Sequence, residues 1–167
     1  MVQLVKEEIE IEGDQFLTFC IKDECFGLRL AQTREILEYK QVTHVPLMPE
    51  FLVGVINLRG EVVPVIDLGI RLDREPIEIK KRTCVIIIEL KVNEENLVLG
   101  LLADTVNEVS SYSSDEIEEV PSFGVNIRSD FILGVAKQEN DFVVLLDAEK
   151  ALSPSELTSL VEQEFSH

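Results

Sequence analysis

An internal repeat constrains the fold of this chain more than any other feature of its sequence. Residues 51–68, FLVGVINLRGEVVPVIDL, align without a gap to residues 131–148, FILGVAKQENDFVVLLDA, with five identical positions in eighteen. A second match, between residues 26–36 and 99–109, lies upstream in both copies. Because the features recur in the same order, we expect two similar lobes, at about 14–81 and 82–152.

Each repeat has the sequence pattern of short β-strands joined by tight turns. QFLTFCI (15–21) and CFGLRLA (25–31) are rich in aromatic and β-branched residues around a charged turn, which predicts a hairpin. Residues 82–90 and 97–103 are the counterpart in the second repeat, and TREILEY (33–39) predicts a brief helical turn. The even spacing of these strands favours two small barrels over one open sheet. We therefore predict a mainly β fold, allowing for exchange of strands at the ends of the lobes.

Glycine and proline mark special backbone positions in the second hairpin of each repeat. The apex is Arg59-Gly60 in one copy and Glu139-Asn140 in the other, and glycine and asparagine both accept a positive φ. Gly54 and Gly134 lie inside strands, where glycine indicates a bulge or a tight corner. Pro64 lacks a ladder donor, so its strand should be bulged there or lie at an edge.

Capping residues predict where the helical segments begin. Asp67 and Asp147 end their strands and are expected to cap the amides that follow. SPSELTSLVEQEF begins with Ser153 and Pro154 and has Glu156 three residues after the serine, which is a capping box. We predict a C-terminal helix over 153–165 whose apolar face docks on a lobe, or alternatively binds a partner, and an acidic N-terminal tail over 1–13.

The charge of the chain limits its partners. It has 32 acidic and 15 basic residues and a formal net charge of −17. Such a chain repels nucleic acids and anionic lipid surfaces. The N-terminus lacks the basic and apolar regions of a signal peptide, and no window approaches the roughly 20 apolar residues of a membrane span. We therefore expect a soluble, cytoplasmic protein that binds no nucleic acid and does not insert directly into a membrane.

The sequence offers little for catalysis or for metal binding. With only two histidines, His44 and His167, a nucleophile–histidine relay is implausible, and no phosphate-binding or zinc-protease motif occurs. Cys20, Cys25 and Cys84 are odd in number and contain no CxxC pair, so we expect reduced, packed thiols. The acids of 115–119 lack EF-hand spacing and are expected to form a solvated edge. We predict a protein that is no enzyme and holds no metal or cofactor.

At NLRG, residues 57–60, the sequence resembles the CheW family of bacterial chemotaxis coupling proteins. The resemblance runs from 15–21 through 51–68 and 98–109 to the last hairpin and helix, about nine-tenths of the chain. It implies a single CheW-like domain over 1–167, built as two five-stranded SH3-like β barrels that pack about a shared hydrophobic interface. It also implies a non-catalytic adaptor that couples the cytoplasmic tips of methyl-accepting chemoreceptors to the regulatory domain of the histidine kinase CheA. Such a protein is recruited from the cytoplasm to membrane-associated receptor arrays.

The resemblance also indicates which residues bind receptors. A lone arginine at a hairpin tip is most simply a solvated charge, but Arg59 matches the family arginine. We expect Arg59 to lie near the groove between the lobes and to pair with Glu35, holding the receptor-facing surface in shape. Ile36 either packs in the core or lines this groove, and Gly60 serves chiefly the backbone.

A second set of residues is assigned to contact with the CheA kinase. Tyr39, Gln41, Val42 and Thr43 follow the predicted helical turn of the first lobe. Phe123 stands in a loop beside a glycine, where it either packs under the loop or contacts the kinase.

Two other functions stay open at this point. One is a CheW-like coupling protein of another chemosensory system, such as one that controls pili. The other, from a different class, is a regulatory module that binds calcium or another metal.

Overall fold

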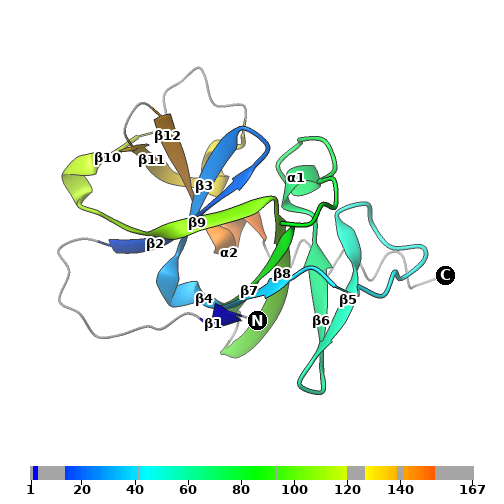
Figure 1. The fold of residues 1–167 in the computed structure, drawn as a ribbon. Coiled ribbons are helices and arrows are strands. Elements are labelled where there is room, and N and C mark those ends of the chain that lie inside the picture. The colour runs from blue at the N-terminus through cyan, green and yellow to red at the C-terminus, as the bar shows by residue number, and fades with distance from the viewer. Residues whose placement is uncertain are drawn as a thin grey trace.

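The computed structural model describes residues 2–3, 14–40, 42–92, 94–119, 127–138 and 141–152, which form two mainly β layers (Figure 1). One sheet, here the first sheet, has the order β1-β4-β7-β8-β6-β5, and the second sheet has the order β10-β11-β12-β3-β2-β9. The first sheet consists of β1 (Val2–Gln3), β4 (Thr33–Glu38), β5 (Leu52–Leu58), β6 (Glu61–Ile66), β7 (Cys84–Val92) and β8 (Glu95–Ala103). The second consists of β2 (Asp14–Ile21), β3 (Glu24–Arg29), β9 (Thr105–Tyr112), β10 (Ile117–Glu118), β11 (Ile132–Gln138) and β12 (Asp141–Leu146). The expected mainly β fold with two packed halves is confirmed, and each sheet as described has six strands where five were expected.

Short helices connect the strands. They are the 3-10 helices η1 (Leu30–Gln32), η2 (Ser114–Glu116) and η3 (Ser129–Phe131), and the α-helices α1 (Leu68–Arg71) and α2 (Ala148–Ala151). Both expected aspartate caps form, since Asp67 Oδ1 accepts from Ile70 N at 3.2 Å and Asp147 Oδ1 accepts from Lys150 N at 3.3 Å. The predicted terminal helix, the Glu139-Asn140 apex and most of the N-terminal tail lie outside the described residues.

The two sheets exchange the first hairpin of each repeat. The β2–β3 hairpin comes from the first repeat but lies in the second sheet, where β3 pairs in parallel with β12. The β7–β8 hairpin comes from the second repeat but lies in the first sheet, where β8 pairs in parallel with β6. The sequence repeats at 14–81 and 82–152 therefore do not coincide with the sheets. In each sheet the exchanged hairpin is complete and lies between strands of the other repeat.

Glycine allows a crossing segment to approach each second hairpin closely. The register shifts between Leu52 and Gly54 and again between Ile132 and Gly134, so the predicted bulges are present in both repeats. A Cβ built on Gly54 would collide with the carbonyl oxygen of Thr43, and one on Gly134 would collide with the Ile117 side chain. The backbone of 43 bridges to Val55, and β10 pairs with β11, at these close approaches.

Pro64 occupies a place where its missing N–H is tolerated. It pairs across the hairpin with Val55, while the parallel pairing of β6 with β8 begins only at Val65. The other side of the strand is therefore unpaired at the proline, although β6 itself lies inside the sheet, between β8 and β5.

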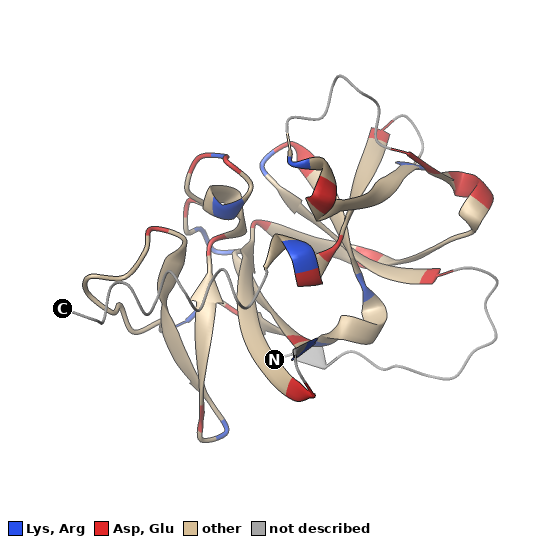
Figure 2. Ribbon diagram, turned by 180° about the vertical axis from the view of Figure 1, so that it is seen from behind, with Lys and Arg blue, Asp and Glu red and all other residues tan. Residues whose placement is uncertain are grey.

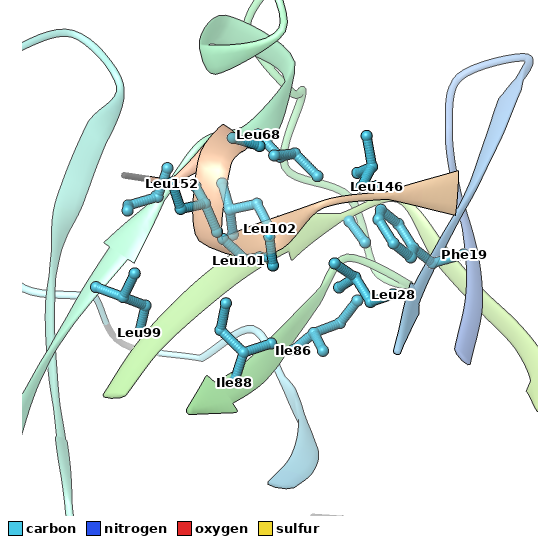
Figure 3. Close-up of a cluster of buried hydrophobic side chains, with 14 of the residues drawn as sticks. Phe19, Leu28, Leu68, Ile86, Ile88, Leu99, Leu101, Leu102, Leu146 and Leu152 are labelled. Atoms are coloured by element: carbon cyan, nitrogen blue, oxygen red, sulfur yellow. The ribbon is translucent and has the colours of Figure 1, made fainter. Parts of the chain in front are cut away.

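One hydrophobic core joins the two sheets. Side chains from both sheets and from the short α-helices meet in it, as Figure 3 shows for Phe19, Leu28, Leu68, Ile86, Ile88, Leu99, Leu101, Leu102, Leu146 and Leu152. Arg71 on α1 adds a polar link, because its Nε donates to the carbonyl of Ala151 at 2.7 Å. Its guanidinium carbon also lies 5.0 Å from the ring centre of Phe131, within cation–π range. The sheets therefore form one packed unit.

Two expectations from the sequence are wrong. Residues 33–38 form the strand β4 instead of a helical turn, because Thr33 and Glu35 alternate inward and the strand pairs with β7. Cys20 and Cys25 form a disulfide, because the hairpin register places them directly opposite each other with their Cα atoms 4.1 Å apart. Cys84 keeps a free thiol.

Candidate functional site

An ion pair in the first sheet joins β4 to the tip of the β5–β6 hairpin. Arg59 Nη1 donates to Glu35 Oε1 at 2.9 Å and Nη2 donates to Glu35 Oε2 at 2.7 Å, a bidentate pair. The Glu35 side chain is 5% exposed, whereas that of Arg59 is 56% exposed. The pair connects strands that lie far apart in the order of the sheet, so it helps to close the sheet on itself.

The hairpin turn holds Arg59 in position. Arg59 and Gly60 have φ angles of 52° and 89°, so both are left-handed, as a two-residue hairpin turn requires. Asn57 Oδ1 accepts a hydrogen bond from Gly60 N at 2.9 Å. The hydrogen bonds from the guanidinium to Glu35, assisted by the charge of that carboxylate, raise the pKa of Arg59. Figure 2 shows a basic and an acidic ribbon segment next to each other at the tip of this hairpin.

A surface hollow of about 530 Å³ lies beside the ion pair. It is lined by Leu37, Glu38, Lys40, Val42, Thr43, Ile56, Asn57 and Val85. Leu37 follows Glu35 by two residues on β4, and Asn57 precedes Arg59 by two residues on β5. The pair therefore sits at one end of the hollow. Its apolar floor with charged and polar rims is suited to a side-chain anchor from another protein.

The structure brings together some of the residues that the sequence assigned to binding. Glu35 and Arg59 pair as expected, and Val42 and Thr43 line the same hollow. Ile36 is half-buried against the core. The hollow is formed in the first sheet between β4 and β5, with Val85 of β7 in its lining. The expected place of Arg59 near a groove between the lobes stays a prediction.

Other assigned residues are placed elsewhere or are not described. Tyr39 is half-buried against the core, and its backbone N–H donates to Thr83 O at 3.0 Å. Gln41 and Phe123 lie outside the described residues, so their assignment to kinase contact stays a prediction.

Sequence reasoning missed several residues of the hollow. Ile56, Val85 and Lys40 were not singled out, because strand alternation alone does not show which distant strand will face β4. Asn57 could have been found, since an asparagine three residues before a turn glycine commonly accepts its backbone N–H.

Known proteins resemble this chain in sequence. Residues 15–156 match the model of the CheW-like domain. The chain belongs to the CheW-like domain family. It is 32% identical over 158 residues to the chemotaxis protein CheW of Klebsiella aerogenes, covering 95% of this chain and 93% of that protein. It is 33% identical over 150 residues to CheW of Bacillus subtilis, covering 89% and 93% of the two chains.

A solved structure extends this CheW likeness to three dimensions. The scaffolding protein TtCheW from Thermoanaerobacter tengcongensis superimposes with a TM-score of 0.72 at 28% identity, over 86% of this chain and 90% of that one. Chemotaxis is therefore the process, and scaffolding the class of function, that the CheW family and these likenesses support.

Two further features bear on the chemistry of this CheW-family chain. Within the described ranges, His, Cys, Asp and Glu side chains nowhere gather in groups of three that could hold a metal ion. In the same part of the chain, no helix is long and apolar enough to cross a membrane. The acids at 115–119 are exposed, as expected for a solvated edge, and Glu116 accepts from the Ser113 backbone and hydroxyl.

Proposed function

We propose that this chain is a chemotaxis adaptor that binds methyl-accepting chemoreceptors and the regulatory domain of CheA, and so couples receptor state to kinase activity. The observation that carries the proposal is the match to CheW proteins over nearly their whole length, 93% of each of two relatives. An adaptor of this kind performs no catalysis and is recruited to membrane-associated receptor arrays.

The Glu35–Arg59 pair and the adjoining hollow are the proposed receptor-facing surface. A receptor helix would place an apolar side chain against Leu37, Val42 and Ile56, while the polar rim fixes its orientation. Arg59 acts chiefly by positioning, because its bond to Glu35 holds the hairpin tip against β4.

Coupling requires that the adaptor bind the active and inactive arrangements of receptor and kinase with different free energies. Coupled systems typically show differences of about 1 to 3 kcal/mol. Repeated contacts in an array raise the effective concentration of each partner, so single contacts can be weak and still assemble.

The decisive experiment reconstitutes receptor-dependent autophosphorylation of CheA with and without this chain, using a receptor and CheA from one organism. We expect kinase activation only when the chain is present. Arg59→Glu should abolish most of the activation, because it places a second carboxylate against the buried Glu35.

Arg29→Glu provides the matched control, since Arg29 is exposed and lies outside the hollow. It should activate as the natural chain does. Circular dichroism of both variants shows whether each is folded. Full receptor binding and kinase activation by a folded Arg59→Glu variant would refute the role of the pair, and no activation by the natural chain would refute the coupling function.

A further inference from the structure

A run of basic residues contrasts with the strongly acidic composition of the chain. Lys80, Lys81 and Arg82 are consecutive, and nowhere else in this sequence of net charge −17 are even two Lys or Arg residues adjacent. All three are exposed in the segment that precedes β7. They concentrate positive charge in one short segment of a molecule that is negative as a whole.

Hydrogen bonds hold this basic run in a defined turn. Lys80 N donates to Thr83 Oγ1 at 2.7 Å, and Thr83 N donates to Lys80 O at 3.2 Å. Thr83 is buried, and Cys84 Sγ donates to Arg82 O at 3.1 Å. Because the backbone of this turn is already ordered, it loses less conformational entropy when a ligand binds than a mobile loop would lose.

The basic turn borders a hollow formed by three separate segments. This basic hollow, of about 590 Å³, is lined by Lys22, Asp23, Lys80, Lys81, Arg82, Thr83, Asp104 and Thr105. The β2–β3 turn and the β8–β9 junction form its other walls, and they are joined by a hydrogen bond of 2.5 Å from Lys22 N to Asp104 Oδ2.

The four bases differ in how far neighbouring acids neutralise them. Lys22 Nζ lies 2.7 Å from Glu75 Oε2, and Lys80 Nζ lies 4.0 Å from Glu78 Oε2. Among the described residues, neither Lys81 nor Arg82 takes part in an ion pair. These two side chains therefore carry the charge that is available to a ligand.

We propose that the basic hollow docks an acidic segment of a partner protein, which Lys81 and Arg82 bind through its carboxylates. Arginine binds carboxylates with paired hydrogen bonds, and lysine adds a point charge. Asp23 and Asp104 lie in the walls, so a compact phosphate that entered the hollow would meet negative charge. An extended acidic chain can instead cross the exposed basic rim.

The net charge of the molecule favours a narrow ligand over a membrane. A broad anionic surface interacts with the charge of the whole chain, which is −17. A peptide segment senses mainly the charges within a Debye length, about 8 Å at physiological ionic strength. This site lies apart from the Glu35–Arg59 pair and does not depend on the proposed coupling function.

Titration of the full chain with a short polyglutamate peptide, followed by NMR, tests the proposal. We expect the backbone amides of 80–83, 22–23 and 104–105 to shift, and the shifts to diminish as salt is added. Lys81→Glu combined with Arg82→Glu should weaken binding about tenfold, as expected for the reversal of two exposed charges.

Arg29→Glu combined with Lys91→Glu is the matched control, because it changes the net charge equally at exposed sites outside the basic hollow. It should alter the affinity less than about twofold, since distant charges are screened. Equal weakening in both double variants, or no shift at the hollow, would overturn the proposal. Tighter binding of inorganic phosphate or of phosphatidylserine vesicles at the hollow would also overturn it, because the ligand would then not be an acidic segment.

Discussion

The partners of the Glu35–Arg59 pair differ in their access to water. Loss of Arg59 would leave the buried carboxylate of Glu35 without the guanidinium that binds it. Loss of Glu35 would instead leave the guanidinium of Arg59, which is already about half exposed to water. The structure is therefore more sensitive to replacement of the arginine than of the glutamate. The family resemblance predicted this pair correctly.

Cys84 gives a pH-dependent prediction at the same scale. Burial, and to a smaller degree the negative charge of its cross-strand partner Glu38, raises the pKa of the Cys84 thiol. Less thiolate is present at a given pH than in the unfolded chain, so alkylation by iodoacetamide should be slower in the folded protein and should rise with pH. The protonated thiol favours the folded state, and this contribution is lost as pH rises through the folded pKa.

Glu38→Gln provides the comparison for Cys84. It removes the smaller cause of the shift and leaves burial in place, so alkylation near pH 8 should become modestly faster. Mass spectrometry of the alkylated protein gives the rate. A rate in the folded natural chain equal to that of the denatured chain would contradict the prediction.

The cysteines also show where prediction from sequence stops at the residue scale. A two-residue turn at Lys22-Asp23 places Cys20 opposite Cys25. Composition cannot distinguish a facing pair of thiols from a disulfide. The odd number of cysteines favoured the wrong alternative, because one of the three stands apart on β7.

At the scale of elements, the two hairpin glycines of the first repeat have different causes, a close approach of the crossing segment at Gly54 and a left-handed φ at Gly60. Gly54→Ala should destabilise the protein by about 3 kcal/mol or more, because the added methyl group collides with backbone atoms of Thr43. Gly60→Ala should cost only about 1 kcal/mol, because nothing lies within 4 Å of the added group and only the left-handed φ is unfavourable.

Urea unfolding of the two glycine variants measures this difference. Each variant serves as the control for the other, since both replace glycine by alanine in the same hairpin. Equal losses in the free energy of unfolding would contradict the role given to the Thr43 crossing.

The hairpins could be predicted because the residues that indicate them are close together in the sequence. The strand β4 could not be predicted in this way, because it pairs with a distant strand. Aromatic and β-branched runs and the turn residues between them predicted β2–β3, β5–β6 and β7–β8 with nearly correct bounds. TREILEY contains Arg, Glu and Leu, which favour helices in isolation. Pairing with β7 and the distant Arg59 partner for Glu35 decide instead in favour of a strand, and neither is visible in a short window of sequence.

At the scale of the whole molecule, the exchanged hairpins make the repeats interdependent. A first repeat on its own would keep β4, β5 and β6 without the β7–β8 hairpin that lies between them. The repeat was visible in the sequence and exchange of strands was allowed for, but the identity of the exchanged hairpins was not visible, because both arrangements require the same strands in the same order. Only the parallel pairings, β6 with β8 and β12 with β3, distinguish them.

Separate fragments test this interdependence. We expect residues 1–81 and residues 82–167, produced separately, to remain unfolded, because each lacks the central hairpin of its sheet and half of the shared core. Mixing the fragments should restore β structure. Circular dichroism with thermal unfolding measures both, and a cooperative transition in either fragment alone would contradict the expectation.

The hairpin exchange also bears on ancestry. A single-repeat forebear of this design has no closed fold as a lone molecule, because the strands that complete its sheet must come from a second copy. Such a forebear would need a second copy to complete its sheets, and end-to-end fusion of two gene copies would join the pair into one polypeptide. The side chains on the surfaces of the two halves could then diverge, while each half still completes the sheet of the other.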